Sequence, residues 1–474
     1  MPATTSPFFT PHGFQGHSGG NRFEPIIDAA AYFSEIYRRI CAARVSVSVA
    51  GYDLDWRIPL VRGQAGGETT LRNALQIAAR RARCRVLVWA PSFAQHVLGT
   101  VGWKVWDDAR ANPIRGVELL LASTSAVWSS HHQKCVIVDS SVAWVGGIDI
   151  ARDRWDTDRH DAAAPRDGDY GPVHDVQGRV EGPAVWDVEY NFGQRWLVAE
   201  REKPYFLDPD GESHEHASMI AAGQRAARGP GARPGKARRL YRRPGGHRVQ
   251  VVRTMPWLGE QGVRDMTARA FGQAKRLVYI ENQYAFQSGW ATRQARLALQ
   301  RERDLRMVVV MPLWPDLLPF PMPGLPDRLD MRENLGSLFT DFGDRVAIVG
   351  LLANGAAPGR YAPIYCHSKV MIVDDVWLTV GSANLDDGSL ESSTELNLSV
   401  LDDSSARNLR EALLGEHLEG MFDQSAVDDP AALLRLIRSA AQDSAHRVAA
   451  REKLRSRVYE YFWDRRAMPE PPRP

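Results

Sequence analysis

The sequence is poor in cysteine and has almost no net charge, and each feature excludes a class of protein. Its 474 residues contain four cysteines, which lie far apart and form no CxxC pair. Scattered cysteines of this kind are typical of a reduced protein with buried thiols, and they exclude a small fold stapled by disulfides. The formal net charge is +2, so attraction to nucleic acid or to an anionic surface has to come from local patches.

Long apolar runs are missing as well. No stretch reaches the roughly 18 consecutive apolar residues that a membrane-spanning helix requires. The first twenty residues lack the basic stretch and continuous apolar core of a secretory signal peptide. We therefore expect no transmembrane helix, no cleavable signal and a cytoplasmic location, with export by a route that needs no signal left open.

The hydrophobic content of 44% and the charged content of 24% are those of a soluble globular protein. A helical pattern is followed by a strand pattern in IIDAAAYFSEIYRRICAA and RVSVSVAGYDLDW, and again in VRDMTARAFGQAKR and RLVYIENQYAF. Such alternation predicts an α/β protein with largely parallel or mixed sheets. We divide the chain into a flexible arm (1–24), an N-terminal half (25–207), a linker (208–246), a C-terminal half (247–425) and a helical extension (426–474).

The linker is rich in glycine, proline and basic residues, among them Arg225, Arg228, Arg233, Lys236, Arg238, Arg239, Arg242 and Arg243. Two interpretations stay open. The favoured one is a solvated connection between the halves. The other is a basic patch that contacts anionic lipid headgroups.

One motif occurs twice at identical spacing. His132, Lys134 and Asp139 are followed after six residues by Gly146-Gly147-Ile148-Asp149. His367, Lys369 and Asp374 are followed after six residues by Gly381-Ser382-Ala383-Asn384. A single HxKxxxxD could arise by chance, and a lone histidine is more often a satisfied core residue. Two copies with matching tails in matching halves indicate a composite site.

The spacing also predicts orientation. On a strand, residues two apart project from the same face, so each histidine points into the cleft with its lysine. Asp139 and Asp374 lie an odd number of residues further on and face the other way, and we interpret them as turn residues of the structural motif. We expect Gly147 and its counterpart Ser382 to let the backbone approach a bound phosphate closely.

The duplicated motif resembles the signature of the phospholipase D superfamily. The phrases HHQKCVIVD, WVGGIDIARDRWDT, HDVQGRVEGPAVWDVEYNFGQRW, YIENQY, HSKVMIVDD and VGSANLDDGS resemble the phospholipase D branch typical of plants and animals. The resemblance covers residues 45–425, with too few residues upstream for that branch's lipid-binding accessory domains. It implies two similar α/β/α sandwich halves with mixed sheets, related by a pseudo-twofold axis, with the active site at their interface. Gly388 departs from the pattern, because an arginine is common at that position.

The resemblance also implies roles. His132 is the expected nucleophile, forming a phosphohistidine, and His367 the acid; Lys134 and Lys369 stabilise charge on phosphorus. Asp175 and Glu395 occupy the places of the carboxylates that hold the imidazoles, with Asp156 as a weaker substitute for Asp175. We expect Asn384 and Asp149 to bind phosphate oxygens. The sequence shows no carboxylate cluster or Cys/His spacing typical of a metal site, and no cofactor is expected.

These features predict a phospholipase D that hydrolyses a phosphatidylcholine-like glycerophospholipid at a membrane surface, with water or a primary alcohol as acceptor. A cardiolipin-synthase-like phosphatidyltransferase is the alternative, and a nuclease is less favoured because no aromatic and basic groove is evident. No nucleic-acid partner is expected. A monomer would suffice for a complete site, although the oligomeric state stays open. Residues 311–326 are apolar and Pro-rich, and they predict either an exposed loop that receives acyl chains, tested through Leu317 and Phe320, or a loop packed over the core.

Overall fold

The structure is a computed structural model that describes residues 6–461, apart from 12–13, 15, 63–68, 91–107, 110, 123–128, 165, 167–169, 202–241, 317–327 and 358. Most of the expected linker and the tip of the Pro-rich loop, including Leu317 and Phe320, lie outside these residues.

The N-terminal half is built on one mixed sheet. The three strands β4, β3 and β2 run parallel to one another, and β5, β6, β8 and β1 continue the sheet with antiparallel pairings. The strands, in the order of the sheet, are β4 (Val117–Ala122), β3 (Arg83–Trp89), β2 (Ser46–Gly51), β5 (Cys135–Val138), β6 (Val142–Gly146), β8 (Val176–Glu181) and β1 (Ser18–Ile27).

The C-terminal half repeats this order strand for strand. Its parallel strands are β13, β12 and β11, and β15, β16, β17 and β9 follow with antiparallel pairings. The strands, in the same order, are β13 (Val346–Asn354), β12 (Arg306–Val310), β11 (Leu277–Asn282), β15 (Lys369–Val373), β16 (Trp377–Gly381), β17 (Glu395–Leu401) and β9 (His247–Met255). The matching order confirms the two similar halves that the repeat predicted.

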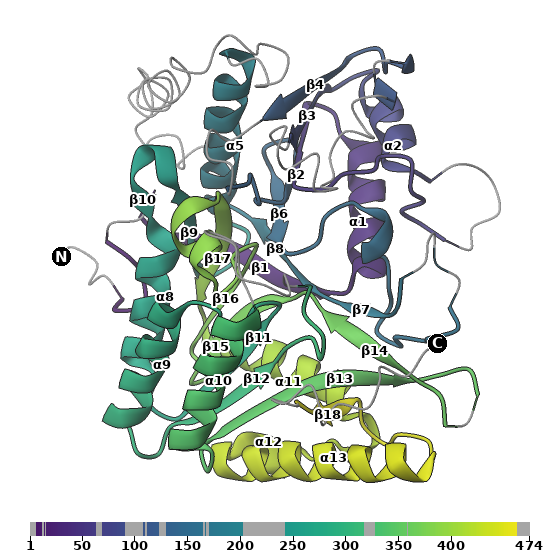
Figure 1. Ribbon diagram of the computed structural model, residues 1–474. Coiled ribbons are helices and arrows are strands. Elements are labelled where there is room, and N and C mark those ends of the chain that lie inside the picture. Colours follow the sequence, from purple (N-terminus) through teal and green to yellow (C-terminus); the bar gives the residue numbers. More distant parts are fainter. Residues whose placement is uncertain are drawn as a thin grey trace.

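Helices cover the sheets in layers (Figure 1). The outer face of the first sheet packs against α1 (Ala29–Ala42) and α2 (Leu71–Ala78). The outer face of the second packs against α8 (Gly262–Gln273), α9 (Gly289–Arg301) and α10 (Arg328–Phe342). The inner faces share one core with α5 (Ala184–Arg201) and α11 (Asp403–Leu418), so the two halves fold as one unit.

Local sequence explains several boundaries. Hydroxyl or carboxylate side chains accept a hydrogen bond from the first turn of α2, α9, α11 and α13 (Pro430–Ala450); these residues are Thr70, Ser288, Asp402 and Asp429. The strands that carry the repeat are buried on both faces, which explains their continuous apolar runs CVIV and VMIV.

The halves are joined edge to edge. β1 pairs with β9 in antiparallel fashion, and the short β7 (Val173–His174) runs parallel to β14 (Tyr361–Cys366) of the other half. The remaining strands are β10 (Glu260–Gln261), beside β9, and β18 (Val458–Glu460), beside β13. Short helices α12 (Gln424–Asp428), η1 (Arg152–Arg154), η4 (Pro256–Leu258), η5 (Gly388–Ser392) and η6 (Glu419–Met421) complete the fold.

Two expected boundaries change. The expectation of a flexible arm over 1–24 is wrong from Ser18 onward, because β1 pairs with both β8 and β9 and buries Phe23. The region after 425 does contain the long helix α13, along the lower edge in Figure 1, but its β18 belongs to the C-terminal sheet. In both segments the backbone forms hydrogen bonds with neighbouring strands, which the amino-acid composition does not indicate.

Two further observations concern the residues described. None of their helices has the length and apolar character needed to cross a bilayer. All four cysteines are free thiols, and Cys84, Cys135 and Cys366 are buried.

Candidate active site

The two copies of the motif meet where the halves are joined. The backbone N–H of His132 donates to the carbonyl of Thr394 at 3.0 Å, and that of His367 donates to the carbonyl of His174 at 2.8 Å. Thr394 and His174 directly precede Glu395 and Asp175. Each motif histidine is thus fixed beside the carboxylate of the opposite half.

The side chains also make contacts between the halves, because each histidine pairs with the carboxylate of the opposite half. Nδ1 of His132 lies 2.9 Å from Oε1 of Glu395, and Nδ1 of His367 lies 2.6 Å from Oδ2 of Asp175. A carboxylate on Nδ1 selects the tautomer whose Nε2 is free to accept a proton or to attack. Asp175 takes this position, whereas Asp156 pairs with His160 and Arg166.

The lysines of the motif lie behind the imidazoles. Each Nζ donates to the carbonyl of its own histidine, two residues earlier. Lys134 also forms an ion pair with Asp149 at 3.1 Å, and Lys369 instead donates to the amide oxygen of Gln283 at 2.9 Å.

Burial and mutual charge set the protonation of the site. Burial, together with the positive charges of Lys134 and Lys369, holds the pKa of His132 well below its usual range. Burial and the charges of Lys369 and Arg154 do the same to the pKa of His367, and Lys134 and His132 add to the effect. Each imidazole therefore lies within electrostatic reach of the other half's lysine, as a shared site requires.

The pKa values of Asp175, Glu395 and Lys369 shift in the direction that favours the neutral form of each side chain. Burial raises the pKa of Asp175 to about 7 and that of Glu395 to about 7, against the opposing charges of the lysines. Burial also lowers the pKa of Lys369 to about 7. A buried set with matched pKa values is typical of functional sites.

Three of the expected phosphate-binding residues lie in different surroundings. A Cβ on Gly147 would meet Asp175 Oδ1 at 2.4 Å, so this glycine makes room for the carboxylate. Ser382 donates its hydroxyl to Glu395. Asp149 is 1% exposed and accepts from the backbone N–H of Tyr52 besides pairing with Lys134. The phosphate contacts expected of Gly147, Ser382 and Asp149 stay predictions, and in the structure these residues lie against Asp175, Glu395 and Lys134 respectively.

The phosphate contact expected of Asn384 also stays a prediction. Asn384 is buried, it lines a small cavity with Lys369, and its Oδ1 has no hydrogen-bond partner within the described part of the chain. This oxygen is an acceptor and is open to a donor group, so it does not by itself test a contact with a phosphate oxygen.

Asp139 and Asp374 are turn residues, as the spacing indicated. Both have a φ of 53°, and each carboxylate accepts three backbone N–H groups at the start of a neighbouring strand. Those groups belong to residues 44–46 before β2 and 275–277 before β11.

Two residues of the site were missed from the sequence. The side chain of Arg154 is 18% exposed, and although burial lowers the pKa of its guanidinium, the carboxylates of Asp153, Asp149 and Asp53 raise that pKa above its ordinary value. Gln283, in the phrase YIENQY, holds Lys369. The RWDT phrase was the available signal for Arg154, but it was used only for its aspartate.

A cavity of about 260 Å³ lies beside this cluster. Its walls include Arg154, Gln283, Trp314, Asp316 and Tyr365, and the ring of Tyr365 is 6.4 Å from that of His367. The first residues of the Pro-rich segment therefore line the approach to the candidate site.

Comparisons with known proteins agree with this geometry. A family model described as phospholipase D matches residues 39–168, and one described as cardiolipin synthase, PLD-like domain, matches residues 344–415. Together with the relatives described next, these matches support a member of the phospholipase D superfamily. The two matches fall one in each half and cover both copies of the motif.

Individual members of the superfamily are more distant. Phospholipase D alpha 3 of Arabidopsis thaliana is 25% identical over 78% of this chain, and phospholipase D alpha 1 of Zea mays is 25% identical over 80%. The chain spans 59% and 60% of the length of these curated relatives. The crystal structure of a phosphatidylserine synthase from Haemophilus influenzae Rd KW20 has the same fold, with a TM-score of 0.56 and 12% identity over 91% of this chain and 95% of that one.

Proposed function

We propose that the protein is a phospholipase D-type phosphodiesterase that hydrolyses the distal phosphodiester of a phosphatidylcholine-like glycerophospholipid to phosphatidate and free alcohol. The observation that carries the proposal is the pair of imidazoles from opposite halves, each held by the other half's carboxylate and each beside a buried lysine. The family matches and the relatives named phospholipase D support it.

The first step is attack by Nε2 of His132 on phosphorus, while Glu395 holds the proton on Nδ1. The bond from phosphorus to the headgroup oxygen breaks, and His367 gives that oxygen a proton. The bound phosphodiester brings negative charge to the site, which favours the protonated form of His367 for this step. The product is a phosphatidyl group on His132 and a free alcohol.

The second step reverses the roles. His367, now neutral, takes a proton from water or from a primary alcohol, and the oxygen attacks phosphorus and displaces His132. Lys134, Lys369, Arg154 and the amide of Asn384 supply fixed positive charge and donors to the phosphoryl oxygens. Asp149, Gly147 and Ser382 position these groups, and no step requires a metal ion.

The phospholipid would be met at a membrane surface. A single chain carries both half-sites, so a monomer is sufficient. We place the protein in the cytoplasm as a peripheral protein. The cavity lined by Trp314 and Tyr365 is the side from which lipid would approach.

A phosphatidyltransferase of the cardiolipin synthase type is the second candidate. It is favoured by the family model that matches residues 344–415, and the same covalent intermediate would serve it. Cardiolipin formed from phosphatidylglycerol without added acceptor, at a rate above that of phosphatidylcholine hydrolysis, would select this function.

The test is a product analysis with phosphatidylcholine vesicles, with and without ethanol. The expected products are phosphatidate and choline, plus phosphatidylethanol when ethanol is present, because the intermediate can be intercepted. The exposed His446→Gln is the matched control for His132→Ala and His367→Ala. Full activity in both alanine variants, or no product from any phospholipid tested, would overturn the proposal.

A further inference from the structure

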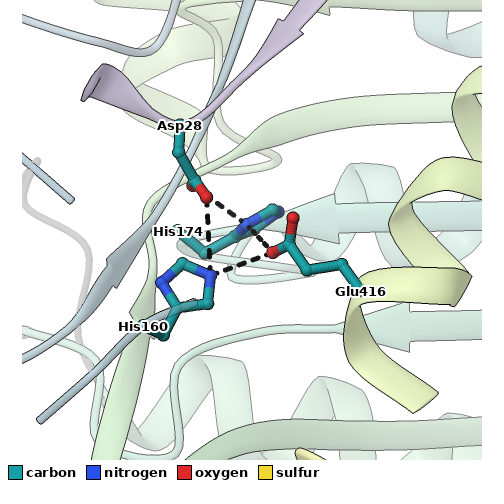
Figure 2. A group of neighbouring side chains, drawn as sticks. All are labelled: Asp28, His160, His174 and Glu416. Carbon is teal, nitrogen blue, oxygen red and sulfur yellow. Dashed lines mark hydrogen bonds and ion pairs between the residues drawn. The ribbon is translucent and has the colours of Figure 1, made fainter. Parts of the chain in front are cut away.

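A second cluster of histidines and carboxylates lies outside the proposed mechanism. Asp28 comes from the junction of β1 and α1, His160 from the loop after η1, His174 from β7 and Glu416 from α11. The side chains converge on one point (Figure 2) and are between 0% and 8% exposed. One nitrogen or oxygen atom from each lies within 4.8 Å of those of the others.

The distances within the cluster match the edges of a metal coordination tetrahedron. Nε2 of His160 is 2.9 Å from Oε1 of Glu416 and 3.6 Å from Oδ2 of Asp28. Nδ1 of His174 is 2.9 Å from the same Glu416 oxygen and 3.3 Å from Oδ1 of Asp28. Ligand bonds of about 2.0–2.1 Å at tetrahedral angles place ligand atoms roughly 3.3 Å apart.

The second nitrogen of each histidine is also held by a carboxylate. Nδ1 of His160 lies 3.1 Å from Asp156, and Nε2 of His174 lies 3.0 Å from Glu281. Asp156 is fixed in turn by Arg166, and Glu281 by the hydroxyl of Tyr279. Metal-binding histidines have such partners, which fix the tautomer and turn the free nitrogen toward the ion.

Two atoms that face the centre of the cluster take part in ion pairs but in no hydrogen bond of good geometry. Oδ2 of Asp28 lies 3.6 Å from Nε2 of His160, and Nδ1 of His174 lies 2.9 Å from Oε1 of Glu416, yet neither atom forms a regular hydrogen bond with the residues that the structure describes. Such buried polar atoms are rare in native proteins, and a bound ion is one of their ordinary explanations.

We propose that Asp28, His160, His174 and Glu416 bind one divalent transition-metal ion of the zinc class. Two imidazole nitrogens and two carboxylate oxygens in tetrahedral arrangement suit such an ion better than calcium or magnesium, which take oxygen ligands in larger number. The two carboxylates balance its charge. An open cavity of about 680 Å³, lined by Asp28, Glu416, Thr157 and Arg457, reaches the cluster and provides the route for the ion.

The ion would stabilise the segment that carries Asp175 and contacts His367. Three of its ligands come from the N-terminal half and Glu416 comes from the C-terminal half. Asp28 exchanges hydrogen bonds with the backbone of Asp175, and the carbonyl of His174 accepts from His367. The bound ion therefore fixes the strand that presents Asp175 to His367, and its role is structural and not part of the phosphoryl transfer.

The test is the metal content of the full-length protein, measured by elemental mass spectrometry after dialysis against metal-free buffer. About one zinc per chain is expected, falling below about a tenth in His160→Gln and Glu416→Gln and unchanged in the control His446→Gln. Chelation followed by added Zn²⁺ should lower and then restore the melting temperature, by about 5–10 °C if the ion is bound tightly.

Cobalt gives a second readout that does not depend on the variants folding. Co²⁺ added to chelated protein should produce the intense visible absorption of a tetrahedral site, with one equivalent at saturation. Less than a tenth of an equivalent of any transition metal, together with no cobalt spectrum and no change in melting temperature, would overturn the proposal and leave a network of protonated histidines and carboxylates. None of these readouts involves phospholipid, so the outcome is independent of the proposed function.

Discussion

The two half-sites share one framework and differ in what surrounds the lysine. In both, a carboxylate from the opposite half holds Nδ1 of the histidine, and the lysine donates to that histidine's carbonyl. Lys134 is then neutralised by Asp149, whereas Lys369 faces the neutral amide of Gln283. The two half-sites therefore have the same contacts around the histidine and differ in the charge of the group that contacts the lysine.

The two motif histidines also differ in their exposure to solvent. The side chain of His132 is 16% exposed and that of His367 is 4% exposed. The more open imidazole suits attack on an incoming phosphorus atom, and the more enclosed one, beside Lys369, suits proton transfer. The following predictions test this division, beginning with the largest effect.

Removal of either imidazole should lower kcat by a factor of about 10⁴ or more, because each acts in a step that the other cannot perform. The two variants should differ with a p-nitrophenyl ester of phosphatidate, whose leaving group needs no acid. His367→Ala should recover a burst of one p-nitrophenol per chain, whereas His132→Ala should show none. Equal bursts in both would contradict the assignment.

Neutralising the exchanged carboxylates should cost about 10²–10⁴ in kcat, because the amide no longer stabilises the imidazolium or its tautomer. Glu395→Gln should slow the attack of His132 on phosphorus and with it the release of the headgroup, and Asp175→Asn should slow the proton transfers that depend on His367. Steady-state and single-turnover rates with a short-chain phosphatidylcholine measure both. Losses below threefold in either variant would show that the exchange is only structural.

The pH dependence of activity should distinguish the role of Lys369 from that of Lys134. Asp175 and Glu395, with raised pKa values of about 7, lose their charge as pH falls, and Lys369, with a lowered pKa of about 7, loses its charge as pH rises. The profile should therefore be narrow, with both limbs near neutrality. Lys369→Arg should move the alkaline limb upward by about one unit or more, since arginine stays protonated.

Lys134→Arg is the matched control for this shift. Its alkaline limb should coincide with that of the unmodified protein, because the limb belongs to Lys369. A limb that moves in Lys134→Arg but not in Lys369→Arg would reverse the comparison.

The smallest difference is expected at the turns. Asp139→Ala and Asp374→Ala each remove the acceptor for three backbone N–H groups from a residue with positive φ. Each should lower the free energy of unfolding by about 2–3 kcal/mol. Urea denaturation measures this, with the exposed Asp304→Ala as control. A difference above 1.4 kcal/mol between the two variants would show that the halves are not equivalent in their frameworks.

The repeat made much of this predictable. Spacing by two predicted that each histidine lies with its lysine, although His132, Lys134 and His367 precede the strands β5 and β15 and do not lie on them. The odd spacing of Asp139 and Asp374 indicated turns. The exchange of Asp175 and Glu395 between halves could not be read from the sequence, because it depends on how two separate sheets meet. The ion pair between Asp149 and Lys134 could not be read from the sequence for the same reason, since spacing gives no information on it.

The second cluster was outside the reach of pattern reading. Asp28, His160, His174 and Glu416 are spread over nearly 400 residues and share no spacing. Only the packing of β7 and α11 against the end of β1 brings them together.

The most direct test of the composite site is rapid quenching of the unmodified protein with a short-chain phosphatidylcholine, under alkaline conditions that preserve phosphohistidine, followed by peptide mass spectrometry. A phosphatidyl adduct on the peptide that contains His132, formed and lost at the rate of turnover, is expected. Turnover without an adduct on any histidine, and with inversion of configuration at phosphorus, would contradict a two-step reaction shared by the two halves.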